Sequence, residues 1–174
     1  MLKQRTAGDK NWPVACSHAT LGEADKELDL SGAHLSYGDF EEATFQAQGA
    51  IKLNGAGLAH ADLSGSEFTA RAGGPYIPGD SADIDFSGAN LAHANLSGSK
   101  ITADGSYGDA TIDFTGANLT NADLSGSEIT ADGSYGAATI DFTEATLDNA
   151  HTSGSTLTAD SVIGLPPCWG PGSC

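Results

Sequence analysis

Aspartate is the residue whose positions in this sequence most suggest chemistry, because carboxylates recur at fixed intervals along the chain. Asp104, Asp109 and Asp113 stand close together within the segment DGSYGDATID. Carboxylate oxygens are ligands that Ca²⁺ prefers, so these three residues are the candidate metal ligands. Their spacing does not match the calcium loop Asp-x-Asp-x-Asp-Gly, and no glutamate closes it. The competing interpretation, which we favour, is that each aspartate accepts hydrogen bonds from the backbone amides of a turn.

Two rows of aspartate and one row of threonine recur at intervals of 28 residues, so each could form a ladder on a folded surface. Like charges at the spacing of neighbouring strands repel each other unless a cation or a neutral group lies between them. Regular threonine rows on a flat β surface can order water, so calcium or ice binding is one functional hypothesis. The rows are Asp85, Asp113 and Asp141; Asp104, Asp132 and Asp160; and Thr102, Thr130 and Thr158, with Thr69 before them.

Histidine offers a third candidate, since His60 and His93 fall in one column of the repeat described below, together with Tyr37. Stacked histidines can bind a metal or respond to pH, although exposed histidines in repeats are more often tolerated polar residues. The sequence shows no Ser-His-Asp arrangement, phosphate-binding glycine loop or paired-carboxylate cleft. We therefore predict a protein that is not an enzyme and that uses no cofactor.

The elements that position these residues follow a repeat of five. From Leu30 onward a large apolar residue recurs at every fifth position, usually with alanine two places before it and aspartate or asparagine just before it. Neither a helix, with a period of 3.6, nor a strand, with a period of 2, produces this spacing. A chain that turns a corner every five residues does, with one large side chain per edge pointing inward. The clearest run is Ala89-Asn90-Leu91 followed by Ala94-Asn95-Leu96.

This pattern resembles that of the pentapeptide-repeat family over roughly Leu28 to Ala159. The resemblance implies an all-β fold, a right-handed quadrilateral β-helix in which four quintets make one square coil. Sorting the apolar centres four at a time predicts about five coils, with Thr152 as the one polar centre. The centres are Leu30, Leu35, Phe40 and Phe45; Leu53, Leu58, Leu63 and Phe68; Phe86, Leu91, Leu96 and Ile101; Phe114, Leu119, Leu124 and Ile129; and Phe142, Leu147, Thr152 and Leu157.

The residues that exceed the repeat always fall between the fourth centre of one coil and the first centre of the next. All inserted loops are therefore predicted to leave the same corner of the square. In place of the expected alanine, the first face of each coil has an apolar residue that predicts an extra ladder under the loops. Tyr107 and Tyr135 are predicted to cover this ladder and, with Tyr76, to contact a partner. The ladder residues are Leu28, Ile51, Ile84, Ile112 and Ile140.

The two ends of the chain are predicted to be caps, since the ends of a solenoid expose its core and unpaired strand edges. Residues 1–27 form the N-terminal cap, 28–160 the repeat domain and 161–174 a C-terminal cap rich in proline, glycine and cysteine. Cys168 and Cys174 could form a disulfide, which requires an oxidising compartment. Three free thiols in a reducing cytoplasm are the alternative. The sequence has no apolar run long enough to span a membrane and no secretory signal pattern.

The chain has 174 residues and a formal net charge of −16. This charge argues against nucleic acid or an anionic membrane as a direct partner, because both require a basic face. It permits a basic protein partner or the mimicry of DNA. It can also serve only to keep a repetitive β protein soluble.

The leading functional hypothesis is a non-catalytic structural or protein-interaction module that docks on a larger assembly. Because the resembled family occurs in cyanobacteria and in the thylakoid lumen, the resemblance suggests an accessory subunit of a lumenal photosynthetic complex. We accordingly favour the thylakoid lumen or another oxidising compartment over the cytoplasm. The first alternative is an acidic DNA mimic that acts on a type II topoisomerase, as quinolone-resistance members of the family do. Those members dimerise through a C-terminal helix, which a tail containing Pro166, Pro167 and Pro171 cannot form.

Overall fold

The structure is a computed structural model that describes residues 14–73, 80–167 and 169. Within these residues the regular elements are short strands joined by turns, and every strand pair is parallel. The strands are β1 (Thr20–Leu21), β2 (Leu28–Asp29), β3 (Thr44–Gln48), β4 (Ala50–Lys52), β5 (Glu67–Arg71), β6 (Ala82–Asp85), β7 (Lys100–Asp104), β8 (Ala110–Asp113), β9 (Glu128–Asp132), β10 (Ala138–Asp141), β11 (Thr156–Thr158) and β12 (Ser161–Ile163).

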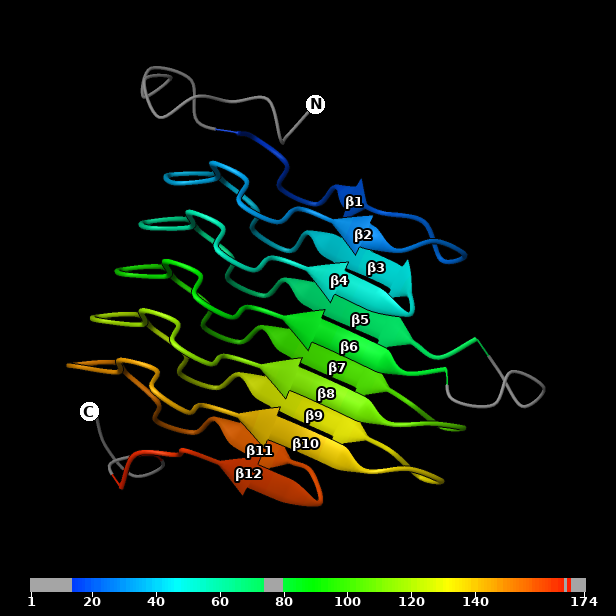
Figure 1. Cartoon of the computed structure of the whole chain (residues 1–174). Coiled ribbons are helices and arrows are strands. Elements are labelled where there is room, and N and C mark those ends of the chain that lie inside the picture. The colour runs from blue at the N-terminus through cyan, green and yellow to red at the C-terminus, as the bar shows by residue number, and fades with distance from the viewer. Residues whose placement is uncertain (1–13, 74–79, 168, 170–174) are drawn as a thin grey trace.

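The strands form two six-stranded sheets, one with the odd-numbered strands in the order β1-β3-β5-β7-β9-β11 and one with the even-numbered strands in the order β12-β10-β8-β6-β4-β2. Each step across a sheet is one turn of the chain around the molecule, as Figure 1 shows. The other two faces of each turn pair through single parallel bridges, such as Asn90 with Asn118 and Asn95 with Asp123. Four faces therefore make one coil, and the predicted quadrilateral β-helix is confirmed.

Large apolar side chains fill the axis of the coils, as the five-residue spacing predicts. Phe86, Phe114 and Phe142 stack with ring centroids 4.9 Å apart and planes within 1° of parallel. This separation is close to the spacing of neighbouring strands, so each ring lies over the equivalent ring of the next coil. Thr152 is fully buried, whereas Leu157 is only partly buried because its coil is the last complete one. The other predicted centres are all buried.

Each corner between the short faces is a hydrogen-bonded turn that explains the composition of the quintet. The carbonyl of Leu91 accepts a hydrogen bond from the N–H of Ala94 at 3.0 Å, and His93 between them has φ 58°. A positive φ at the third residue is the mark of a type II turn, which favours glycine or asparagine there. The inward alanine must be small because it also points into the core, and Ala94 is buried. The repeat is therefore a sequence of tight turns with alternately large and small inward residues.

The corner where the two sheets meet has a different geometry. Ile101 and Ala103 on β7, and Ala110 and Ile112 on β8, are all fully buried and alternate with outward polar residues. The period here is two, so this corner is extended and the cross-section is not a uniform square. The predicted apolar ladder is confirmed in register from Leu28 to Ile140.

The parallel ladder is longer at both ends than the repeat visible in the sequence. Leu21 on β1 lies in register with Phe45, and Ala15 bridges Asp39. At the other end β12 pairs with β10, and the ring of Trp169 packs 5.1 Å from that of Phe142. Parts of both segments predicted as caps thus continue the coils. A capping role for their remaining residues stays a prediction.

Candidate interaction surface at the loop corner

The inserted loops that the structure describes in full, between β7 and β8 and between β9 and β10, leave the corner between the two sheets, as predicted. Figure 1 shows both of them projecting on the same side of the molecule. We call residues 105–109 and 133–137, the two loops that the structure describes in full, the paired loops. This corner is the one place where the otherwise regular surface of the described coils is interrupted repeatedly.

Glycine brings the paired loops into direct backbone contact. A Cβ atom at Gly136 would lie 2.4 Å from the carbonyl oxygen of Gly108, which no side chain tolerates. A Cβ at Gly108 would likewise collide with the carbonyl oxygen of Asp80 in the preceding loop. The carboxylate of Asp109 accepts a hydrogen bond from the N–H of Ala137 at 2.9 Å. The loops are thus stacked and fixed in position, rather than independent.

Two tyrosines stand on the paired loops. The rings of Tyr107 and Tyr135 are parallel within 4°, with centroids 6.0 Å apart. Tyr107 is 47% exposed and Tyr135 is 83% exposed. The prediction that these rings cover the isoleucine ladder is therefore wrong, because Ile112 and Ile140 are already enclosed by the coils. The rings are instead free to contact another molecule.

The first aspartate row, Asp85, Asp113 and Asp141, lies in register on the outer face of the even-numbered sheet. In each case Oδ1 accepts a hydrogen bond from the backbone N–H two residues later, at 2.7–2.8 Å. Charged acceptors shorten and strengthen such bonds. These carboxylates therefore stabilise turns, which supports the structural interpretation of the row while leaving its negative charge on the surface.

Lys52 adjoins this row, in register with Asp85 on one side and Asp29 on the other. Its ammonium lies 2.8 Å from a carboxylate oxygen of Glu27. This hydrogen bond is the main cause that raises the pKa of Lys52 above its usual value, with the nearby aspartates adding to it. A cation thus separates Asp29 from the three stacked aspartates.

The proposed calcium ligands are used separately. Asp104 accepts from the N–H of Ser106, Asp109 from Ala137, and Asp113 from Thr115. Nowhere in residues 14–73, 80–167 and 169 do three or more His, Cys, Asp or Glu side chains gather closely enough to hold a metal ion. The structure does not bring the three aspartates together as one site.

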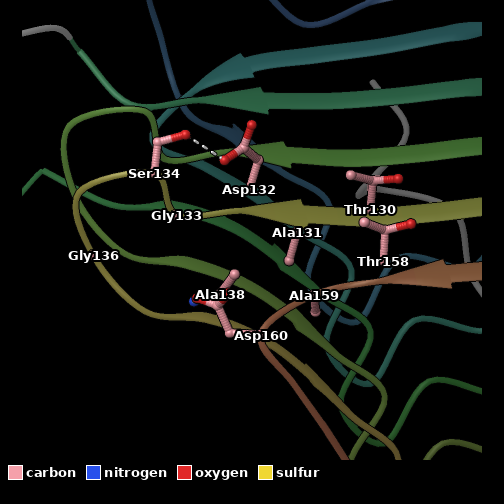
Figure 2. A pocket seen from close by; sticks show the side chains of 10 residues that line it. All are labelled: Thr130, Ala131, Asp132, Gly133, Ser134, Gly136, Ala138, Thr158, Ala159 and Asp160. Carbon is pink, nitrogen blue, oxygen red and sulfur yellow. Dashed lines mark hydrogen bonds between the residues drawn. The ribbon is translucent and has the colours of Figure 1, made fainter.

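A groove of about 480 Å³ lies at the C-terminal end of the loop corner. Figure 2 shows Asp132 and Ser134 on one side of it and Ala138 and Asp160 on the other. The hydroxyl of Ser134 donates to Asp132 at 2.7 Å, and Asp160 accepts from the N–H of Ala138 at 3.2 Å. Asp132 and Asp160 belong to the second predicted row, and they are the two members that line this groove.

Comparison with known families finds a match for part of the coils. Residues 82–102 and 112–130 match the sequence model of the pentapeptide repeats, with eight copies. The chain carries pentapeptide repeats. Proteins of this family are typically non-catalytic structural or interaction proteins. A search of curated proteins gave no match.

Three solved structures are similar to this chain at low sequence identity. The pentapeptide-repeat protein Rfr23 from the cyanobacterium Cyanothece 51142 is 17% identical, with 87% of this chain and 88% of that chain covered and a TM-score of 0.39. HetL from the cyanobacterium Nostoc sp. strain PCC 7120, involved in heterocyst differentiation regulation, is 20% identical, with 87% and 76% covered and a TM-score of 0.18. QnrB1, a plasmid-mediated fluoroquinolone resistance protein, is 16% identical, with 84% and 92% covered and a TM-score of 0.21. All three scores are below 0.5, so the architecture rests on the strand order and register described above.

Other predicted residues fall in two groups. Tyr76, Cys168 and Cys174 lie outside the described residues, so the third tyrosine contact and the disulfide stay predictions. The threonine row lies in register from Thr69 to Thr158 on the odd-numbered sheet.

The histidine column is a stack of flat rings. Tyr37 and His60 have centroids 4.8 Å apart, and His60 and His93 have centroids 4.7 Å apart. The rings are parallel, so their nitrogen atoms do not converge on one point as metal ligands must.

No helix among the described residues is long and apolar enough to cross a membrane.

Sequence reasoning missed the groove. Its signal is nevertheless present, because no inserted residues follow Leu157 as they follow Ile101 and Ile129. The last coil therefore contributes no loop to the corner, and the space that such a loop would fill stays open.

Proposed function

We propose that this pentapeptide-repeat protein is a non-catalytic scaffold that docks on a protein partner, as an accessory subunit of a larger assembly, through the loop corner. The observation that carries the proposal is the exposed tyrosine pair on the stacked loops. Tyrosine is enriched where protein interfaces concentrate their binding energy. Two parallel rings at one corner, over coils whose other faces are short polar turns, make the paired loops the best candidate for the contact.

The rigidity of the paired loops supports this role. Association costs conformational entropy when loops must be ordered on binding, and a preformed surface avoids part of that cost. Here Gly108 and Gly136 lock the loops through backbone contacts, and Asp109 ties one loop to the other. The tyrosines are therefore presented in nearly the geometry that a partner would meet.

For the compartment, we propose the thylakoid lumen on the resemblance to lumenal members of the family. A disulfide between Cys168 and Cys174 would support an oxidising compartment of this kind, and peptide mapping of the unreduced protein tests it. Two free thiols in protein isolated from its native source would argue for the reducing cytoplasm instead.

A second candidate function is the mimicry of DNA, which the first aspartate row favours. Asp85, Asp113 and Asp141 line up on one face at the spacing of neighbouring strands, and the chain has a net charge of −16. A regular row of anionic groups is what a DNA-binding groove recognises. Each of these carboxylates also holds a turn, however, so the row exists for a structural reason independent of any partner.

Two multiple variants separate these functions. In the first, Tyr107→Ala is combined with Tyr135→Ala; in the second, Asp85→Asn is combined with Asp113→Asn and Asp141→Asn. Asparagine keeps the acceptor oxygen that each turn uses, so the second variant changes charge and little else. We expect affinity capture from the native source to lose its specific partner with the tyrosine variant and to keep it with the asparagine variant. Purified wild-type protein should not inhibit the supercoiling of DNA by a type II topoisomerase at micromolar concentration.

The reverse result would replace the proposal. Inhibition of supercoiling that disappears in the asparagine variant and weakens steeply with salt would make the aspartate row the functional surface. Partner capture that survives the loss of both tyrosines would remove the loop corner from the interaction.

A further inference from the structure

The groove at the C-terminal end occupies the position where the next loop of the stack would lie. In the two preceding coils this position is filled, because Gly108 lies against the backbone of Asp80 and residues 133–137 lie on residues 105–109. The last coil passes from β11 to β12 through Ala159 and Asp160 alone. The loops of the two preceding coils thus show what kind of chain segment fits this space.

Backbone donors in the groove lack the acceptors that their equivalents have. The N–H of Ala72 donates to the carbonyl of Asp104 at 2.9 Å, and that of Gly105 donates to Asp132 at 2.7 Å. Gly133 is the next residue in this series, and the structure gives its N–H no acceptor among the described residues. Gly133 lines the groove and is itself buried, and a buried backbone donor without an acceptor favours an incoming carbonyl oxygen.

Ala138 shows the same deficit in a second series. The equivalent N–H groups of Ala82 and Ala110 donate to backbone carbonyls of the following loop, at 3.0 and 2.9 Å. Because no loop follows it in the stack, the N–H of Ala138 donates to the side chain of Asp160 at 3.2 Å. The carboxylate stands in for the missing carbonyl and, at the same time, brings a negative charge to the groove.

The walls of the groove indicate which side chain the segment would carry. Asp132 and Asp160 both line the groove, and both are exposed. Tyr135 stacks on Tyr107 with one face of its ring and is otherwise exposed, and it stands on the loop between Gly133 and Gly136, which both line the groove. A planar cation suits both the two carboxylates and the exposed aromatic ring. A guanidinium can lie flat over a ring while its N–H groups, which lie in the guanidinium plane, donate to carboxylates. A lysine ammonium offers neither the plane nor the fork of donors.

We propose that this groove binds an arginine-bearing segment of a partner protein. A backbone carbonyl of the segment accepts from the N–H of Gly133, and the guanidinium lies over the free face of Tyr135 within reach of Asp132 and Asp160. A second copy of this chain is disfavoured as the occupant, because two molecules with a net charge of −16 repel each other. The inference rests on the proposed function, since it names the chemistry by which a docking partner would engage the loop corner.

The test is a titration of the ¹⁵N-labelled full chain with the tripeptide acetyl-Gly-Arg-Gly-amide, followed through the amide resonances. We expect saturable shifts of the amide resonances of Gly133 and Ala138. We expect none at Gly105 and Ala110, because their N–H groups already donate to backbone carbonyls of the next coil. The same peptide with citrulline in place of arginine keeps the planar group without the charge, and we expect it to bind about five- to tenfold more weakly.

The internal repeat supplies matched variants. Asp132→Asn and Tyr135→Ala should each weaken binding of the arginine peptide about fivefold. Asp104→Asn, at the equivalent position of the preceding coil, should leave it unchanged. Asp160→Asn retains an oxygen for the N–H of Ala138 and tests the charge of that residue alone. Amide spectra of the coils away from the loop corner serve as the check that each variant is folded.

Two results overturn the inference. One is the absence of saturable shifts up to roughly 10 mM peptide, beyond the millimolar affinity expected of so short a segment. The other is equal binding of the arginine and citrulline peptides. If either occurs while partner capture still depends on Tyr107 and Tyr135, the arginine chemistry is wrong and the docking function stands. If partner capture is independent of both tyrosines, the docking function itself is wrong.

Discussion

At the scale of single residues, the turn at each corner demands an uncommon backbone conformation. In the turns that follow the first and third centres of a coil, glycine usually adopts this conformation. In the turn that follows the second centre, the residue at this position is never glycine. Side chains there pay for the left-handed conformation and must be held by something else. The five residues, all with φ between 56° and 59°, are Tyr37, His60, His93, Asn121 and Asn149.

Two different compensations operate along this column. Asparagine tolerates positive φ better than other residues that have a side chain, which accounts for Asn121 and Asn149. Tyr37, His60 and His93 instead stack ring on ring at 4.7–4.8 Å. Stacking between aromatic rings contributes about 0.5–1.5 kcal/mol per pair, the same order as the backbone strain. The histidines thus have a structural explanation that needs neither a metal nor a proton.

Cys16 provides a pH-dependent prediction at this scale. Burial, and to a smaller extent the Asp39 carboxylate, raise the pKa of its thiol above the ordinary value. A raised pKa means that the thiolate, the reactive form, appears at higher pH in the folded protein than in the unfolded chain. In a Cys168→Ser, Cys174→Ser background, we expect the rate of alkylation by iodoacetamide to rise with a midpoint above that measured in urea.

Asp39→Asn is the matched control for this prediction. It removes the charge but keeps the oxygen that accepts from the N–H of Glu41. Because burial is the larger cause, the substitution should lower the midpoint only part of the way. A native midpoint at or below the value in urea would contradict the burial of Cys16.

At the scale of elements, the stacked loops predict a steric effect confined to the corner. In Gly136→Ala the new methyl group would meet the carbonyl of Gly108 at 2.4 Å, so the two loops must separate. We expect faster hydrogen exchange at the N–H of Ala137, whose acceptor is the Asp109 carboxylate, while the core amides of β8 and β10 stay protected.

Gly98→Ala is the comparison for that variant. A Cβ at Gly98 meets nothing within 4 Å, but its φ of 64° is strained for alanine. This variant should lower the global free energy of unfolding by about 1 kcal/mol without selective opening of the loops. Equal exchange at Ala137 in both variants would show that the loops are not held by the glycine contact.

Much of the element layout can be read from the sequence, because in this fold the inward residues recur at a constant interval. The centres, the apolar ladder at Ile84 and Ile112, and the common corner of the loops all follow from counting. The coil that contains Cys16 and Leu21 does not, because the quintet around a cysteine lacks the usual large apolar centre. The pattern is weakest where an end coil has fewer neighbours to match.

The positions of loop side chains could not be predicted in the same way. Tyr107 and Tyr135 were expected over the isoleucines, since large rings beside an apolar ladder commonly cover it. The extended corner encloses Ile112 and Ile140 within the coil instead, through the buried alanines Ala110 and Ala138. Spacing along the chain reports which residues face inward, but it does not report how one loop lies on another.

At the scale of the whole molecule, calcium is predicted to have little effect on stability. A ligand that binds only the folded state raises the midpoint of thermal unfolding by mass action. Each of the three candidate carboxylates accepts from a different backbone N–H, two within their own turns and Asp109 from the next loop, so they offer no shared site. We expect thermal melts in millimolar Ca²⁺ and in excess chelator to differ by less than about 1 °C, after matching ionic strength.

Magnesium at the same concentration is the control for general screening of the net charge of −16. Equal small shifts with both cations would reflect that screening. A rise of several degrees with calcium alone, lost in an Asp109→Asn variant, would restore the aspartates as ligands.

The constant offset of 28 between stacked coils has a consequence for inheritance. Ile101 lies under Ile129 and Ile112 lies under Ile140, so removal of any 28 consecutive residues from this region would leave every remaining side chain beside an equivalent neighbour. Two stretches of the gene that encode nearly the same loop, TADGSYG, also offer a place where misaligned copies could recombine. The number of coils is then a quantity that a single deletion or duplication of 28 residues would change by a whole unit.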